Sequence, residues 1–129
     1  MIEISIAKDQ IIPLLLDACP SFKVVYEGSD YQDSPYTIAG EFSDHLLMLY
    51  KQGNVIEFSR VAELIERLIV YGDSYTKEYA IVGILESVQN VWGQNSVDTR
   101  DFESILLPES QEYWQRLNDF WEGKIPFDG

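Results

Sequence analysis

Residues 58–90, FSRVAELIERLIVYGDSYTKEYAIVGILESVQN, predict two helices joined by a sharp corner. Apolar residues recur three and four positions apart in the first half, as in a helix with one buried face: Phe58, Val61, Ala62, Ile65, Leu68 and Ile69. We expect Gly72 to end this helix in the left-handed conformation. Asp73 or Ser74 can then cap the next helix. That second helix is apolar around most of its circumference, which predicts neighbours on several sides.

The segments on either side of this pair also predict helices, separated by turn-forming residues. An extended segment is expected at 2–7, an acidic loop at Glu27–Ser34 and a loosely held tail at 124–129. The expected helices are Asp9–Ala18, Phe22–Tyr26, Pro35 to near Gly53, Thr99–Ile105 behind an Asp98 cap, and Pro108 to near Gly123. Gly40 and Gly83, inside helices, suggest close approach of a neighbouring helix.

The fold class predicted from this pattern is all-α, with about six or seven helices in a single domain, 1–129. Short corners between helices favour antiparallel pairs. Such pairs can stack as a short array resembling helical repeats, or they can pack as an irregular bundle.

The composition limits the classes of partner and the compartment. The chain has 22 acidic and nine basic residues, a formal charge of −13. Such a charge repels nucleic acid and anionic membrane, and it favours a basic protein partner or simply solubility. One cysteine, Cys19, excludes an intramolecular disulfide. Neither a signal peptide nor a membrane-spanning run is visible, so a cytoplasmic location is expected.

Few residues suggest catalysis or metal binding. His45 is the only histidine, and with Glu41 and Asp44 it lies on one face of the third helix. A structural metal needs about four protein ligands, so we predict a polar helix face here rather than a metal site. Cys19 and His45 form the only Cys/His pair, and no phosphate-binding, nucleotide-binding or nucleophile motif occurs. The sequence therefore predicts no catalytic residue and no cofactor.

A set of polar residues lies on the two helices of residues 58–90. We expect most of them to form a buried polar network that links these two helices, with a ligand-facing patch as the alternative. The members are Glu66, Arg67, Asp73, Glu86, Gln89 and Asn90.

Tyrosines and carboxylates coincide in and beside the acidic loop, at Asp30, Tyr31, Asp33 and Tyr36. This composition suits contact with a basic protein surface, because tyrosine is enriched at interfaces and the acids supply complementary charge. In the alternative interpretation the tyrosines pack locally and the acids face water.

Several short motifs along most of the chain resemble those of a group of short acidic bacterial proteins known only as a domain of unknown function. The motifs are CPSF at 19–22, GEFSDHL at 40–46, IERL at 65–68, GDSY at 72–75, GILE at 83–86 with Gln89-Asn90, LPES at 107–110, and Trp114, Leu117, Phe120 and Trp121. The resemblance implies a bacterial cytoplasmic protein with a helical fold, and it implies no activity. Small acidic proteins of this kind are also similar to immunity proteins, which cover the active sites of secreted toxins.

These observations favour a non-enzymatic protein-binding module, monomeric or homodimeric, of which an immunity-type inhibitor of a basic toxin is one form. The alternative is a small scaffold or regulatory domain that binds a peptide or helix of a partner. An enzyme that uses paired carboxylates is the least favoured hypothesis, because 22 acids produce such pairs by chance.

Overall fold

The computed structural model describes residues 5–123, and every regular element within them is helical. The elements are η1 (Lys8–Gln10), α1 (Ile11–Ala18), α2 (Phe22–Glu27), α3 (Pro35–Lys51), α4 (Phe58–Tyr71), α5 (Ser74–Glu78), η2 (Tyr79–Leu85), α6 (Glu86–Gln94), α7 (Arg100–Ile105) and α8 (Pro108–Trp121). Because η1 leads into α1, and α5, η2 and α6 follow one another without a break, the described part of the chain contains seven helices. The all-α prediction is confirmed.

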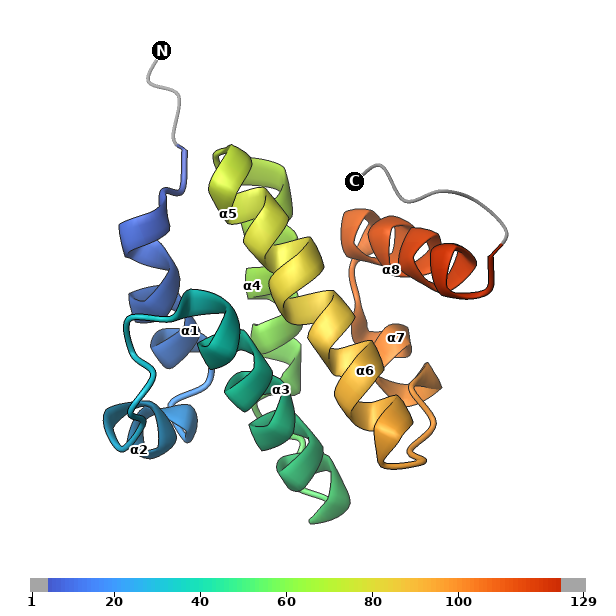
Figure 1. Ribbon diagram of the computed structural model, residues 1–129, viewed down its shortest axis with the longest axis horizontal. Coiled ribbons are helices and arrows are strands. Elements are labelled where there is room, and N and C mark those ends of the chain that lie inside the picture. The colour runs from blue at the N-terminus through green and yellow to red at the C-terminus, as the bar shows by residue number, and fades with distance from the viewer. Residues whose placement is uncertain (1–4, 124–129) are drawn as a thin grey trace.

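The helices pack as an irregular bundle, which decides between the two arrangements predicted from the sequence. Helix α4 lies in the middle and contacts α1, α5, η2, α7 and α8, while α3 runs along η2 and α6. Figure 1 shows α1 and α2 on one side of these central helices and α8 on the other.

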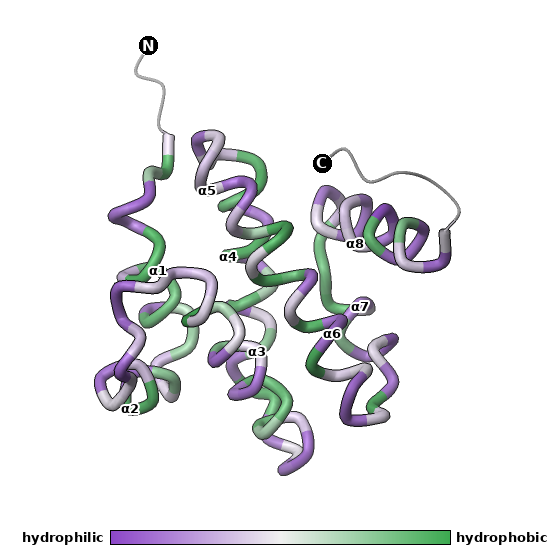
Figure 2. The backbone as a smooth tube through the Cα atoms, viewed as in Figure 1, coloured by the Kyte–Doolittle hydropathy of each residue, from purple (hydrophilic) through white to green (hydrophobic). Residues whose placement is uncertain are grey.

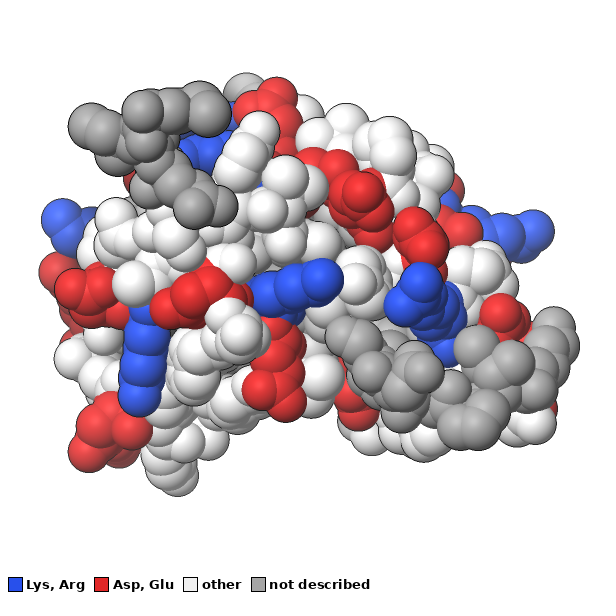
Figure 3. All heavy atoms as spheres, turned by 90° about the horizontal axis from the view of Figure 1, so that it is seen from above, with Lys and Arg blue, Asp and Glu red and all other residues white. Residues whose placement is uncertain are grey.

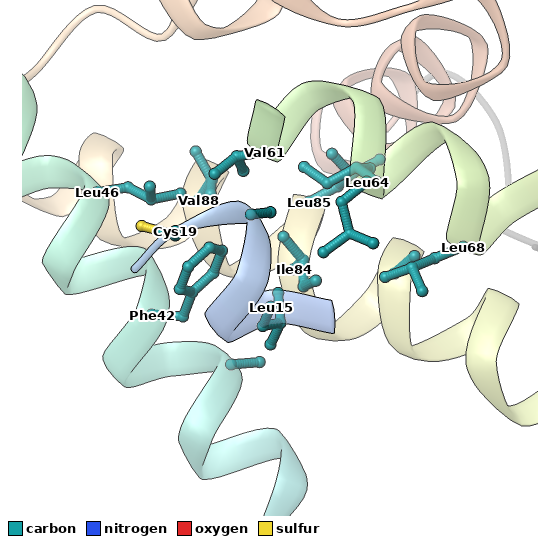
Figure 4. Packing of buried hydrophobic residues seen from close by; sticks show 14 of the residues in the cluster. Leu15, Cys19, Phe42, Leu46, Val61, Leu64, Leu68, Ile84, Leu85 and Val88 are labelled. Atoms are coloured by element: carbon teal, nitrogen blue, oxygen red, sulfur yellow. The ribbon is translucent and has the colours of Figure 1, made fainter. Parts of the chain in front are cut away.

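The long helix formed by α5, η2 and α6 is buried on most of its sides, as its apolar sequence predicted. Ile81, Ile84 and Leu85 are at most 2% exposed, and apolar residues recur along η2 and α6 in Figure 2. In Figure 4, Ile84 and Leu85 meet side chains of α1, α3 and α4, including Leu15, Phe42 and Leu68. Its middle part, η2, is a π-helix, which the sequence pattern did not predict.

The corner at Gly72 corrects one expectation. The helix ends there, but Gly72 has φ −77° and ψ 150°, so it is extended and not left-handed. Its neighbours pair with Ile6, whose N–H donates to the Tyr71 carbonyl at 2.8 Å and whose carbonyl accepts from the Asp73 N–H at 2.9 Å. The extended N-terminal segment therefore has a partner, at least in its described residues 5–7.

The other predicted helix ends match the structure closely. The Asp73 side chain accepts from the Thr76 N–H at 2.9 Å and caps α5, and Pro108 is the first residue of α8. Gly53 and Gly123 follow α3 and α8 with φ of 71° and 76°, as expected of glycines that close helices. Residues 1–4 and the predicted tail at 124–129 lie outside the described residues.

Aromatic contacts fasten the C-terminal helices to the bundle. The ring centroids of Trp92 in α6 and Phe102 in α7 are 5.4 Å apart, and those of Phe102 and Trp114 in α8 are 5.7 Å apart. All three side chains are at most 1% exposed. Buried aromatic pairs of this kind each add about 0.5–1.5 kcal/mol beyond the area they bury, so this cluster holds α7 and α8 in place.

Candidate functional site

The acidic loop is an ordered projection between α2 and α3. Gln32 donates from its side chain to the Tyr26 carbonyl at 2.9 Å. The Ser29 hydroxyl accepts from the Tyr31 N–H at 3.0 Å and donates to the Glu41 carboxylate at 2.8 Å. These bonds join both ends of the loop to its flanking helices.

The predicted contact residues of this region divide into two groups. Asp30, Tyr31 and Asp33 are exposed on the loop itself. Tyr36 is the second residue of α3, and its ring leans on Tyr79, with centroids 5.4 Å apart. Burial, and to a lesser extent the charge of Glu78, raises the pKa of the Tyr36 phenol. Tyr36 is therefore partly used in packing although it is still 42% exposed, whereas the other three side chains point to solvent.

A groove between α2 and α3 adjoins the loop and was not predicted. This α2–α3 groove has a volume of about 310 Å³ and is lined by Val25, Glu41, Asp44, His45 and Met48. Its lining contains no lysine or arginine. The sequence contained a pattern from which the groove wall could have been predicted. The lining residues of α3 recur at three- and four-residue spacing and therefore share a helix face.

Apolar and acidic surfaces lie side by side in the α2–α3 groove. Met48 is 44% exposed and Val25 37%. Burial, together with the nearby charge of Glu41, raises the pKa of the Asp44 carboxyl. A cation that enters the groove would relieve this repulsion, while its apolar stem could contact Met48 and Val25.

The predicted polar network is not a single network between the two central helices, and this is a correction. Glu66 in α4 accepts from the Ser110 N–H at 2.9 Å, the Ser110 hydroxyl at 2.8 Å and the Glu109 N–H at 3.2 Å. Gln89 in α6 donates to the Trp114 carbonyl at 3.2 Å. Both residues therefore hold α8, each from a different helix.

The remaining members of that set lie apart from one another. Asp73 caps α5, and Arg67 and Asn90 are exposed on α4 and α6. Glu86 is half-buried, and burial raises the pKa of its carboxyl. These four residues do not converge on a ligand site or on a shared network.

A polar corner joins the α1–α2 turn to α3 and to the start of α4. The Ser21 hydroxyl lies 2.8 Å from His45 Nε2 and donates to Glu57 Oε1 at 2.5 Å, while the Ser21 N–H donates to Glu57 Oε2 at 3.1 Å. A catalytic triad places histidine between serine and the acid. Here serine lies between the other two, and its single proton is directed to Glu57. The arrangement therefore supports helix anchoring.

Cys19 lies beside this corner, and the structure places it in the core. Its side chain is 0% exposed, and burial raises the pKa of its thiol to about 11. Glu57, with Oε1 3.7 Å from the sulfur, acts in the same direction. A buried thiol with a raised pKa is a poor nucleophile, as expected of a small apolar core residue.

The described residues contain neither a cluster of metal ligands nor a helix suited to span a membrane. Within residues 5–123, no three His, Cys, Asp or Glu side chains are grouped so that they could hold a metal ion. Glu41 accepts a hydrogen bond from the Ser29 hydroxyl, and His45 Nε2 lies 2.8 Å from the Ser21 hydroxyl. None of the described helices combines the length and apolar content needed to cross a membrane.

Comparison with known proteins identifies the family. No curated protein and no solved structure gives a significant match. A family model described as "Domain of unknown function (DUF7674)" matches residues 12–122, which include every helix from α1 to α8 apart from the first residue of α1. The chain therefore belongs to the DUF7674 family.

Proposed function

We propose that this protein is a non-enzymatic protein-binding module that recognises a basic partner through the α2–α3 groove and the adjoining acidic loop. The observation that supports the proposal most directly is the α2–α3 groove itself, in which exposed apolar side chains adjoin Glu41 and Asp44. Aliphatic stems with charged ends, as in lysine and arginine, complement both parts of such a surface.

Net charge alone does not orient a partner on this molecule. Figure 3 shows acidic and basic side chains interspersed on the face that is seen from above. Net charge steers a basic partner towards the molecule from a distance. Binding in one orientation needs a local combination of shape, apolar area and charge, which the groove and loop provide.

Within this proposal, an immunity-type inhibitor is the specific form suggested by the acidic composition. Such a protein, in a bacterial cytoplasm, would cover the active site of a basic toxin with the loop and the α2–α3 groove. A scaffold or regulatory domain that binds a basic peptide or helix would use the same surface. The identity of the bound protein distinguishes these two forms.

Capture experiments with matched variants test the proposal. The full chain serves as bait at low salt for lysate and for secreted proteins, and retained proteins are identified by mass spectrometry. Glu41→Lys with Asp44→Lys reverses charge in the groove, and Asp30→Lys with Asp33→Lys reverses it on the loop. Glu63→Lys, at an exposed site on α4, is the control.

We expect one basic protein to be retained by the wild type and the Glu63→Lys variant and to be released as salt rises. With the purified partner, each double reversal should slow association by roughly tenfold and flatten its salt dependence. Retention that is equal in all variants, or association rates independent of salt, would contradict the proposed surface.

A further inference from the structure

A second hollow lies on the other side of the acidic loop and has a different chemistry. This tyrosine pocket, of about 440 Å³, lies between η1, α1, the start of α3 and the α5–η2 segment, and its lining includes Lys8, Asp9, Asp73, Tyr75 and Tyr79. The volume is in the range of small-molecule sites, about 300–1,000 Å³. None of its lining residues belongs to the α2–α3 groove.

The walls of the tyrosine pocket are held in place before any ligand arrives. The Tyr79 hydroxyl donates to the Pro35 carbonyl at 2.7 Å, and Tyr79 is 0% exposed. The rings of Tyr75 and Tyr79 are stacked, with centroids 6.3 Å apart and planes at 20°. Asp73 is fixed by its cap on Thr76. A pocket with fixed walls loses little entropy on binding.

The tyrosine pocket already holds a cation against an aromatic ring. The Lys8 ammonium lies over the ring of Tyr75, 5.0 Å from its centroid, which is a cation–π contact. Asp9 and Asp73 lie in the same lining, so its two carboxylates and one ammonium sum to −1. Ile11 and Ile12 supply apolar surface beside them. The pocket thus combines an aromatic face, an excess of negative charge and an apolar wall.

We propose that the tyrosine pocket is a binding site for a small alkylammonium cation. The ammonium group of the ligand takes the place of Lys8 Nζ over the Tyr75 ring, and its apolar body lies against Ile11 and Ile12. Asp9 and Asp73 favour the cation over an uncharged molecule of the same shape. This site does not depend on the protein-binding function proposed above.

The test uses choline as the probe and 3,3-dimethylbutan-1-ol, its uncharged isostere, as the matched control ligand. Binding to the full chain is followed by amide and side-chain NMR shifts of Tyr75, Tyr79 and Ile12. We expect saturable shifts with choline and binding at least about fivefold weaker for the isostere. Equal affinity for the two ligands, or no saturable shift at these residues, overturns the proposal.

Four substitutions separate the aromatic face from general effects on folding. Tyr75→Phe keeps the ring and should bind choline with little change, whereas Tyr75→Leu should weaken binding at least about fivefold. Lys8→Met removes the resident cation and should strengthen binding severalfold, while Lys23→Met, at an exposed position of α2, should leave it unchanged. If Tyr75→Leu does not fold, the Lys8→Met comparison decides, because unchanged or weaker binding there contradicts the proposed displacement.

Discussion

At the scale of single residues, Gly72, Gly40 and Gly83 differ in how much space surrounds them. A Cβ added at Gly72 would lie 2.2 Å from the Leu68 carbonyl oxygen and 2.7 Å from Thr76 Cγ2. At Gly40 it would meet nothing within 4 Å, so the close approach predicted there is wrong. At Gly83 it would lie 3.5 Å from Ala39 Cβ, which is ordinary van der Waals contact, so α3 lies beside Gly83 but leaves room for a methyl group.

These distances predict opposite effects of alanine at the first two positions. Gly72→Ala should lower the free energy of unfolding by about 1–3 kcal/mol, because the corner must shift to admit the methyl group. Gly40→Ala should raise it by about 0.5–1 kcal/mol, since alanine loses less backbone entropy in a helix. Urea unfolding followed by circular dichroism measures both, and a Gly72→Ala variant as stable as wild type would refute the close contact.

His45 predicts how stability depends on pH. Burial lowers the pKa of its imidazole below the ordinary value of about 6.5, and the opposing effect of Glu57 is smaller. The unfolded chain therefore binds a proton at a higher pH than the folded chain does. The stability that neutral His45 contributes is present above about pH 6.5 and is lost as the pH falls below that value.

Unfolding experiments at about pH 7 and about pH 5.5 test this prediction. His45→Gln removes the titrating group, and His45 is the only histidine in the chain. The wild type should lose more stability than the variant between these two pH values. An equal loss in both proteins would assign the pH dependence to other groups.

At the scale of elements, the docking of α8 depends on an acid from a distant helix. The N-terminal N–H groups of a helix have no partner within it, and at α8 the Glu66 carboxylate accepts two of them. The negative charge also opposes the positive end of the helix dipole. A side chain of α4 thus caps a helix that begins more than 40 residues later, with Ser110 at a separation of 44.

We expect Glu66→Gln to lower the free energy of unfolding by about 1–2 kcal/mol, since it weakens a charged cap. Glu63→Gln, at an exposed position of the same helix, should change it by less than about 0.5 kcal/mol. Hydrogen exchange gives a second measurement, because the first amides of α8 should lose protection in Glu66→Gln and keep it in Glu63→Gln. Unchanged protection in both would show that the Glu66 cap does not hold the start of α8.

At the scale of the whole molecule, the excess of acids is a cost to stability. The formal charge is −13, and the described residues contain three ion pairs, all with exposed partners: Asp17–Arg60, Asp98–Arg100 and Glu112–Arg116. Exposed pairs each contribute at most about 1 kcal/mol. Repulsion due to the excess of negative charge therefore favours expansion of the chain.

This repulsion predicts that moderate salt stabilises the protein. Between about 20 and about 300 mM NaCl the melting temperature should rise by roughly 2–4 °C, because added salt shortens the Debye length and screens the repulsion. The Asp30→Lys and Asp33→Lys double variant, with less net charge, should show a smaller rise. A melting temperature that falls with salt would mean that the surface ion pairs outweigh the repulsion.

The sequence by itself determined the helices and most of their ends, because these depend on neighbouring residues. The stripe from Phe58 to Ile69, the Asp73 cap and the left-handed Gly53 all follow from residues a few positions apart. The acidic, exposed character of the loop followed from composition in the same way.

Only the tertiary structure decided what the polar side chains contact. Ser21 meets Glu57 at a separation of 36 residues, and Glu66 meets Ser110 at a separation of 44. The α2–α3 groove and the tyrosine pocket likewise combine segments whose relative placement depends on how the whole core packs. A helical pattern states which face of a helix is buried, but several neighbours can bury the same face. The choice among them is made by packing over the whole bundle.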